Sequence, residues 1–445
     1  MAIVNMEIPR KSSGKGDVFP AGRMLPFSLV TSLFFMWGVP NNLNDVLIRQ
    51  FMKSFALTRF EAGLVQSAFY LGYFLLAIPA ALIMRRFGYK TGILIGLSLF
   101  AAGTYLFWPA AIAGKYLFFL GALFVIACGL SFLETASNPF IAQIGDPETS
   151  ERRLNFSQAF NPIGAITGVV VGTVFIFSGV ELSKSQIAAM QALGTYEAYL
   201  RSETLRVVTP YLVLGTAALV LALVILRTKF PAIQSEHEAD SGDHGHFMEL
   251  FRYPHFLLAI CAQFMYVGAQ VGTWSYFIQY VQEAIHQPEK VAGFFLTGTL
   301  AAFAAGRFAS VYLMRFFAPN RILGVFALVN VVLVTIGVLQ PGQVGVWAIF
   351  MTSFFMSLMF PTIFALGIKR LGPNTKIGCS LLVMSIIGGA VLTPLMGLLA
   401  EAGHRTAVAY LVPLAGYLCV AAYAFYGATR GLQENSSASE ADAAI

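Results

Sequence analysis

The stretch FVIACGLSFLETASNPFIAQIG, residues 124–145, contains the features that decide the fold. It is long enough to cross a bilayer as a helix, which takes roughly 20 mostly apolar residues. One carboxylate, Glu134, interrupts it, and Asn138 follows one helical turn later. A charge at that depth is costly unless it is protonated, paired or turned toward a polar cavity. The stretch predicts a membrane helix with a polar functional face, and the alternative is a structural glutamate bonded to a neighbouring helix.

The rest of the chain has the same apolar character. Of its 445 residues 57% are hydrophobic and 11% are charged, whereas soluble proteins carry about 25% charged residues. The sequence therefore predicts an all-α membrane protein with twelve transmembrane helices. Their approximate ranges are 25–48, 62–84, 91–111, 116–144, 153–178, 208–226, 255–281, 291–315, 321–340, 344–368, 377–400 and 406–428.

A polar linker divides these apolar runs into two sets of six. The predicted organisation is a tail over 1–24, a six-helix bundle over 25–226, a linker over 227–254, a second six-helix bundle over 255–428 and a tail over 429–445. The linker contains His237, His244 and His246 among acidic residues, and this composition favours a solvated loop over a metal site.

The distribution of Lys and Arg predicts the orientation in the membrane. If both termini are cytoplasmic, the inside segments hold roughly 18 of these residues and the outside loops about 9. The opposite orientation would reverse that ratio. We therefore expect both termini in the cytoplasm, and the net charge of +6 reflects this bias without implying nucleic-acid binding.

A second carboxylate, Asp45, lies late in the first apolar run, within MWGVPNNLNDVL (36–47). Helical spacing places Asn41 and Asp45 on one face, with Asn44 beside them. The group could mark a helix end that meets water, but the apolar residues that follow favour a helix that continues. Arg307 is the most embedded basic residue, and both a structural role and a substrate contact fit it.

Two further apolar runs carry polar side chains at helical spacing. Gln158 and Asn161 are i, i+3 neighbours, so both amides can point the same way. The seventh run has a stripe at i, i+3, i+7 and i+11, formed by Gln263, Tyr266, Gln270 and Trp274. Because amides rarely face lipid, the stripe should face another helix or an aqueous cavity. Amides and carboxylates bind hydroxyls and aromatic rings stack on pyranoses, so the set fits a sugar.

Signatures of enzymes are missing from the sequence. The chain has no G-x-x-x-x-G-K-[ST] phosphate loop, which argues against direct use of ATP. No pair of nucleophile and base stands out for hydrolysis. We therefore expect no catalytic residues, no metal site and no cofactor.

Six segments together resemble the fucose:proton symporter family, a branch of the major facilitator superfamily. They are MWGVPNNLND (36–45), GLVQSAFYLGYFLLAIPA (63–80), ETASNPF (134–140), QAFNPIGA (158–165), AQFMYVGAQ (262–270) and PTIFALGIKRLG (361–372). The resemblance is collinear over about residues 25–430. One superfamily motif, between the second and third helices, is degenerate here, because Arg85 occupies its acidic position. The resemblance implies two six-helix bundles around a midplane site that opens alternately to each side.

The resemblance also implies roles for individual residues. Asp45 and Glu134 would handle the coupling proton, while Gln158 and Asn161 would contact the sugar. Phe360 stands where the fucose pattern has a tyrosine before Pro-Thr-Ile-Phe, which leaves the exact sugar open. The full set of candidate sugar contacts is Asn41, Glu134, Asn138, Gln158, Asn161, Gln263, Tyr266, Gln270, Trp274 and Phe360.

The resemblance implies a proton-coupled importer of L-fucose or a related monosaccharide, acting as a monomer in the bilayer of a bacterial inner membrane. One alternative is a glucose, galactose or N-acetylglucosamine carrier of the same family, with sodium coupling or none. A drug:proton antiporter and a non-transporting sugar sensor are further alternatives. The amide-rich fifth and seventh helices argue against the antiporter, and the short polar C-terminal tail argues against the sensor.

Overall fold

The computed structural model describes residues 22–145, 153, 156–231, 247–314, 316–369, 371 and 375–428. Within these ranges twelve helices are long and apolar enough to cross a membrane, which confirms the predicted number. Most of both predicted tails, and His237, His244 and His246 of the linker, lie outside the described residues.

The first half of the chain forms one bundle. Its elements are α1 (Met24–Phe55), α2 (Arg59–Tyr105), α3 (Phe107–Ala113), α4 (Tyr116–Gln143), α6 (Phe160–Val171), the π-helical turn η2 (Gly172–Ile176), α7 (Lys184–Ala192), α8 (Tyr196–Leu205) and α9 (Val208–Arg227). α2 contains two membrane spans, because Gly88 interrupts it with φ 80° and ψ 167°. Glycine adopts positive φ without the steric cost that other residues meet.

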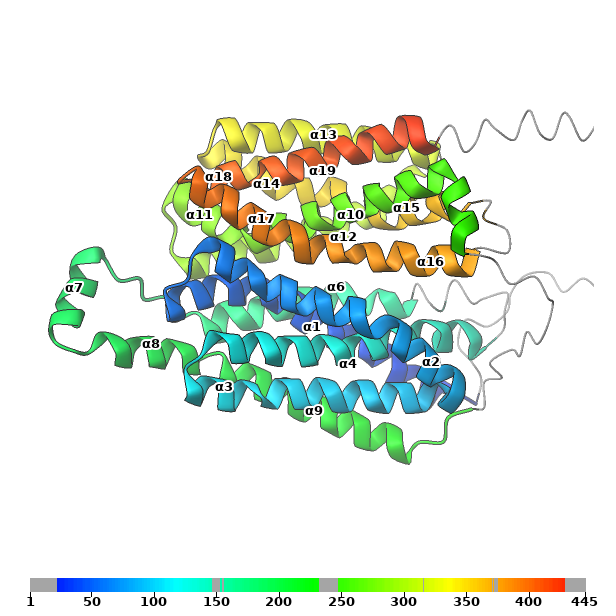
Figure 1. Ribbon diagram of the computed structural model, residues 1–445, viewed down its shortest axis with the longest axis horizontal. Helices are drawn as coiled ribbons and strands as arrows, with labels where there is room; N and C mark the ends of the chain where they lie inside the picture. The colour runs from blue at the N-terminus through cyan, green and yellow to red at the C-terminus, as the bar shows by residue number, and fades with distance from the viewer. Residues whose placement is uncertain are drawn as a thin grey trace, which may run out of the picture.

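The second half forms the other bundle, and the two lie side by side (Figure 1). Its elements are η3 (Phe247–Arg252), α10 (Pro254–Ser275), α11 (Phe277–Ile285), α12 (Glu289–Leu313), α13 (Pro319–Leu339), α14 (Gln343–Met356), α15 (Met359–Gly367), α16 (Thr375–Met384), η5 (Ser385–Ile387), α17 (Gly388–Ala402), α18 (Thr406–Ala409), α19 (Leu411–Ala422) and η6 (Tyr423–Gly427). Each bundle contributes six membrane spans, as expected for the major facilitator fold.

Two features of the first bundle differ from the predicted ranges. α1 continues to Phe55, past the predicted end near residue 48, so the polar group around Asp45 lies inside the helix. The segment between the predicted fifth and sixth spans forms the short helices α7 and α8. α7 begins with a capping box of Ser183 and Gln186. It has no buried residue, so its sequence lacks the apolar run from which a helix would have been predicted.

The molecule has two distinct ends. α7 and α8, with the chain around residues 178–206, project from one end, which we call the α7–α8 end (Figure 1). The described chain ends, near Gly22 and Ala428, lie at the other, which we call the terminus end. An even number of spans places both chain ends on the same side of the membrane.

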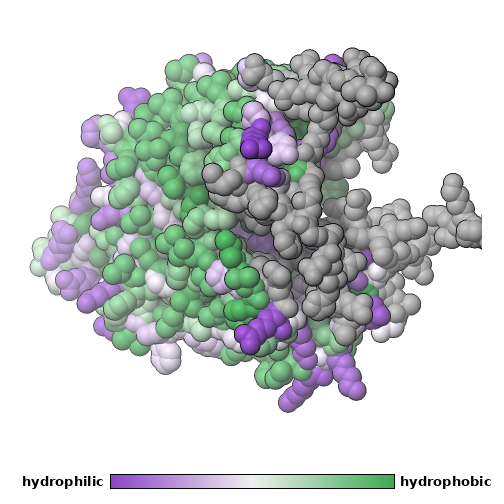
Figure 2. Space-filling model, turned by 45° about the vertical axis from the view of Figure 1, so that its right-hand side comes forward, coloured by the Kyte–Doolittle hydropathy of each residue, from purple (hydrophilic) through white to green (hydrophobic). Residues whose placement is uncertain are grey.

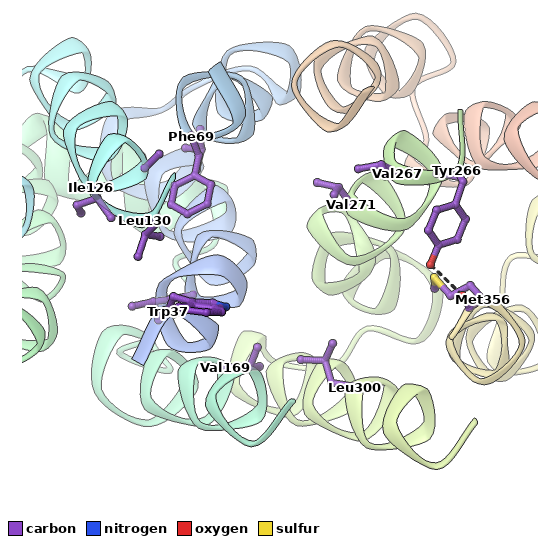
Figure 3. Packing of buried hydrophobic residues seen from close by; sticks show 14 of the residues in the cluster. Trp37, Phe69, Ile126, Leu130, Val169, Tyr266, Val267, Val271, Leu300 and Met356 are labelled. Carbon is purple, nitrogen blue, oxygen red and sulfur yellow. Dashed lines mark hydrogen bonds between the residues drawn. The ribbon is translucent and has the colours of Figure 1, made fainter. Parts of the chain in front are cut away.

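Apolar side chains fill the interior and also cover much of the surface. Trp37, Phe69, Ile126 and Leu130 pack together inside the first bundle (Figure 3). On the outside large apolar residues remain exposed, and Figure 2 shows a broad hydrophobic face with hydrophilic residues gathered toward its edges. Contiguous exposed apolar surface of this extent is unusual for soluble proteins and suits a lipid environment.

Small residues allow α1 and α6 to pack backbone against backbone. A Cβ atom at Gly164 would lie 2.1 Å from the carbonyl oxygen of Phe35, and one at Gly38 would lie 2.4 Å from that of Asn161. Membrane helices commonly approach through such small residues. This packing holds α1 and α6 in fixed register, which positions Asn41, Asp45 and Asn161.

Candidate functional site

Asp45 lies buried between helices of both bundles. It is 2% exposed on α1, and its Oδ1 accepts hydrogen bonds from Gln66 Nε2 on α2 and from Ser275 Oγ on α10, each at 2.9 Å. Gln66 Nε2 also donates to Ser275 Oγ at 3.0 Å. This burial argues against a helix end that simply meets water, and it leaves the carboxyl group fixed by neutral donors.

Glu134 occupies a different environment on α4. It is half-buried, and among the described residues its carboxylate forms no ion pair. The Tyr73 hydroxyl faces both Glu134 and Asn41 without completing a hydrogen bond to either. Asn138 Nδ2 donates to the backbone oxygen of Glu134 at 3.0 Å. The Glu134 carboxylate thus keeps acceptor capacity for a proton or a sugar hydroxyl.

One face of α2 connects the two carboxylates. Gln66, Tyr70 and Tyr73 follow at i, i+4 and i+7, which places them on the same side of the helix. Tyr70 interacts electrostatically with both Asp45 and Glu134, and its ring centroid lies 6.4 Å from that of Tyr73. Sequence reasoning missed this face, although the spacing of its polar residues within GLVQSAFYLGYF was a usable signal.

The two amides predicted on the fifth span, Gln158 and Asn161, bond to different neighbouring helices. Gln158 is exposed and its Nε2 donates to Asn138 Oδ1 at 3.4 Å, which brings it to the side of Glu134. Asn161 is half-buried and its Nδ2 donates to the backbone oxygen of Phe34 at 3.4 Å. Asn41 is half-buried, and its Oδ1 has no hydrogen-bond partner among the residues that the structure describes. The residues of the first bundle that the sequence singled out therefore lie on facing helices.

The predicted stripe on α10 separates into a buried part and a partly exposed part. Gln263 and Tyr266 are both fully buried, and the Tyr266 hydroxyl donates to the backbone oxygen of Met356 at 2.8 Å (Figure 3). Gln270 and Trp274 are half-buried, and Trp274 Nε1 donates to Ser353 Oγ at 3.0 Å. Tyr266 thus packs within its own bundle, while Gln270 and Trp274 retain surface for a ligand.

An aromatic and cationic group adjoins Trp274 in the second bundle. The Trp274 ring meets Phe303 of α12 edge-on at a centroid distance of 5.2 Å. The Arg307 guanidinium lies 5.2 Å from the centroid of the same phenyl ring, and its Nε is buried without a partner among the described residues. Phe303 was not singled out from the sequence, because a phenylalanine in an apolar helix carries no signal of its own. Phe360 of α15 is half-buried and stacks with Phe364 at 6.4 Å.

Polar contacts between the bundles gather toward the α7–α8 end. Lys53 pairs with Glu289 at 3.2 Å, and Arg59 pairs with Glu283. The Phe60 amide donates to Glu401 Oε1 at 2.7 Å. In the first bundle, the hydrogen bonds described between the two bundles all involve residues 45–67 or 179–181. The structure is therefore a state in which the bundles are joined at the α7–α8 end.

Comparisons with known proteins agree with this architecture. The family model of the Major Facilitator Superfamily matches residues 27–379. The chain is 46% identical over 397 residues to the L-fucose-proton symporter of Escherichia coli (strain K12), covering 88% of this chain and 90% of the relative. It is 35% identical over 405 residues to the glucose/galactose transporter of Brucella abortus biovar 1 (strain 9-941), covering 89% and 92%.

A solved structure extends the likeness to three dimensions. The crystal structure of the major facilitator superfamily transporter FucP in the outward conformation has a TM-score of 0.67 and 43% sequence identity. The match covers 91% of this chain and 99% of that one. This chain belongs to the major facilitator superfamily and, within it, to the family of the L-fucose-proton symporters.

Proposed function

We propose that this protein imports L-fucose or a closely related monosaccharide together with protons. The observation that carries the proposal is the pair of carboxylates in membrane helices, Asp45 held by neutral donors and Glu134 free of any described cation. The L-fucose-proton symporter of E. coli, at 46% identity, supports both the substrate class and the coupling ion.

The two carboxylates supply the coupling chemistry. Protonation removes a charge whose burial in the membrane is costly, so a protonated carboxyl group can cross the occluded stage of the cycle more readily than an ionised one. Inward movement of one positive charge gains about 2.3 kcal/mol per 100 mV of membrane potential. Bundles that rock about a midplane site convert this free energy into sugar accumulation.

The sugar would bind between Glu134 with its neighbouring amides and the half-buried Trp274. Asn138 and Gln158 lie beside Glu134 and offer amide donors and acceptors to hydroxyl groups. Trp274 is fixed by Ser353 and Phe303 and offers an aromatic surface. Phe360 adds an apolar wall where a tyrosine would add a hydroxyl.

The orientation belongs to the same proposal. The excess of Lys and Arg supports a cytoplasmic terminus end, in a bacterial inner membrane. The α7–α8 end then faces outward, and the contacts that join the bundles there describe a state closed to the outside.

Uptake into proteoliposomes tests this proposal. Purified protein is reconstituted and radiolabelled L-fucose uptake is measured with and without an inward proton gradient, in sodium-free buffer. We expect the gradient to drive accumulation that a protonophore abolishes. No uptake of L-fucose, glucose or galactose, or uptake indifferent to the proton gradient, would contradict proton-coupled import.

Glucose or galactose is the second candidate substrate. The glucose/galactose transporter of Brucella abortus is 35% identical over most of both chains, and Phe360 replaces the hydroxyl expected of a fucose carrier. Competition of each sugar against labelled L-fucose separates the candidates. If galactose competes and is accumulated while L-fucose is not, the second candidate replaces the first.

A further inference from the structure

We propose that Gln66 and Ser275 are positioning residues that link the protonation of Asp45 to closure of the α7–α8 end. The inference deepens the proposed function, because it rests on Asp45 as a carrier of the coupling proton. Its observations are the three hydrogen bonds that join Asp45, Gln66 and Ser275, and the origin of these residues in both bundles.

The three side chains form a closed and fully enclosed network. Asp45, Gln66 and Ser275 are 2%, 1% and 0% exposed. Gln66 Nε2 donates to the other two residues, and Ser275 Oγ accepts from Gln66 while donating to Asp45. Both donors reach the same carboxyl oxygen, Oδ1, and Oδ2 has no hydrogen bond to a described residue. A proton can therefore bind at Oδ2 while Oδ1 stays the acceptor of both bonds.

The network crosses the boundary between the bundles. Asp45 and Gln66 belong to α1 and α2, whereas Ser275 is the last residue of α10. When the α7–α8 end opens, Ser275 moves away with its own bundle and Asp45 loses one donor. Gln66 stays with Asp45, because α1 and α2 belong to one bundle.

In this geometry the Ser275 bond favours the ionised form of Asp45 in the closed state. A hydrogen bond donated to a carboxylate favours the ionised form, and here it partly offsets the cost of burying the charge. Closing the α7–α8 end adds the Ser275 bond, which opposes the effect of burial and lowers the cost of releasing the proton from Oδ2. Opening removes that bond, so the contribution of Ser275 to proton release is present only in the closed state. Proton uptake in the open state and proton release in the closed state suit a symporter that takes its proton from the side at which the α7–α8 end opens.

Other groups around Asp45 do not replace this contact. Tyr70 of α2 is the titratable side chain described as interacting with Asp45 from a packed helix. Arg49, one turn further along α1, lies 3.9 Å from Glu181. From α10 the described contact is the neutral hydroxyl of Ser275.

Ser67 provides a matched control. Its Oγ also donates across the bundle boundary, to the backbone oxygen of Ala390 at 2.6 Å, but it has no hydrogen bond to Asp45. Removing the Ser67 hydroxyl therefore weakens closure without changing the carboxyl network. A difference between Ser67→Ala and Ser275→Ala in carboxyl band frequency or in transport therefore reports the contact to Asp45 separately from general packing between the bundles.

Infrared spectroscopy of the full-length protein in liposomes tests the inference without any sugar. The carboxyl C=O band that disappears in Asp45→Asn is assigned to protonated Asp45. We expect this band to move to higher frequency in Ser275→Ala and Gln66→Leu, because Oδ1 then accepts one hydrogen bond fewer. Ser275→Thr keeps a hydroxyl, so the band should remain at its wild-type frequency. Ser67→Ala should also leave the frequency unchanged.

Transport of the same variants gives the functional readout. We expect proton-driven accumulation to fall about tenfold in Ser275→Ala while sugar counterflow, which needs no net proton movement, is retained. An unshifted band in both Ser275→Ala and Gln66→Leu, or no band sensitive to Asp45→Asn, would overturn the inference. Absence of all sugar transport by the wild type, with the band shifts present, would instead overturn the proposed function alone.

Discussion

At the scale of single residues, the two carboxylates occupy unlike settings that suggest unlike tasks. Asp45 is enclosed and bonded to donors from two other helices, whereas Glu134 is half-buried and faces Tyr73. A group that exchanges its proton as the bundles open and close suits the first setting. A group that must exchange contacts with a ligand suits the second, because its acceptor capacity is not filled.

Neutralising either carboxylate should separate binding from coupling. We expect Asp45→Asn and Glu134→Gln to lose at least tenfold of proton-driven accumulation, since neither amide can carry the proton. Asp45→Asn should retain sugar binding, measured by calorimetry, and Glu134→Gln should weaken it as well. Glu197→Gln, at an exposed position on α8, is the control and should behave as wild type. Full accumulation in both variants would remove these residues from the mechanism.

Tyr73 should support Glu134 through its hydroxyl. We expect Tyr73→Phe to reduce sugar uptake about threefold to tenfold, because a typical hydrogen bond, here one that the Tyr73 hydroxyl would complete with Glu134 or the sugar, contributes about 1 kcal/mol. Tyr105→Phe is the control, since its hydroxyl contacts Thr216 at an exposed site. Equal uptake by the two variants would mean that the Tyr73 hydroxyl has no part in the site.

At the scale of helices, close backbone packing decides where the polar residues meet. α1 and α6 approach through Gly38 and Gly164, and this contact sets the position of Asn161 along the axis of α1. α2 similarly packs on α17, where a Cβ at Gly63 would lie 3.0 Å from Pro394 Cα. The carbonyl contacts leave no room for a Cβ atom at Gly38 or Gly164, whereas at Gly63 a Cβ atom would require the neighbouring atoms to shift.

A substitution at Gly164 should therefore destabilise the first bundle. Gly164→Val places a branched side chain against the Phe35 carbonyl, and we expect a loss of about 1–3 kcal/mol, the usual range for overpacking. Thermal unfolding in detergent would show a lower Tm. Gly121→Ala on α4 is the matched control, because a Cβ there meets nothing within 4 Å. Equal Tm values for the two variants would contradict the close packing of α1 on α6.

At the scale of the whole molecule, closure of the α7–α8 end rests on contacts between segments far apart in the chain. Lys53 pairs with Glu289, Arg59 with Glu283, and Ser67 bonds Ala390. A carrier that alternates must break this set in every cycle. Arg59 and Glu283 are 22% and 38% exposed, and ion pairs this open to water contribute little, whereas Glu289 is fully buried against Lys53.

A reversible crosslink across this end should stop the cycle. We expect Ser67→Cys combined with Ala390→Cys, in a chain whose native cysteines are replaced, to form a disulfide that abolishes uptake. Reduction should restore uptake, and either single cysteine should transport in both conditions. If the oxidised double variant transports at the wild-type rate, separation of α2 and α17 is not a step of the cycle.

The sequence alone determined the features that depend on local pattern. The twelve spans follow from the length and hydropathy of each run, and the prediction that Glu134 and Asp45 are functional follows from the cost of a carboxylate in a membrane. The polar stripe on α10 was also visible, although its helical spacing did not reveal that Tyr266 bonds Met356 within its own bundle. Periodicity fixes which residues share a face but not what that face meets.

Only the tertiary structure decided which distant residues meet. Ser275 lies 230 positions from Asp45, and the sequence of α2 did not reveal that Gln66 would meet either residue. Tyr73 reaches Glu134, and Phe303 joins Trp274 to Arg307, through the same kind of packing. Such pairs depend on the register between helices and on the state of closure. That register is set by contacts summed over the whole interface, which no local stretch of sequence contains.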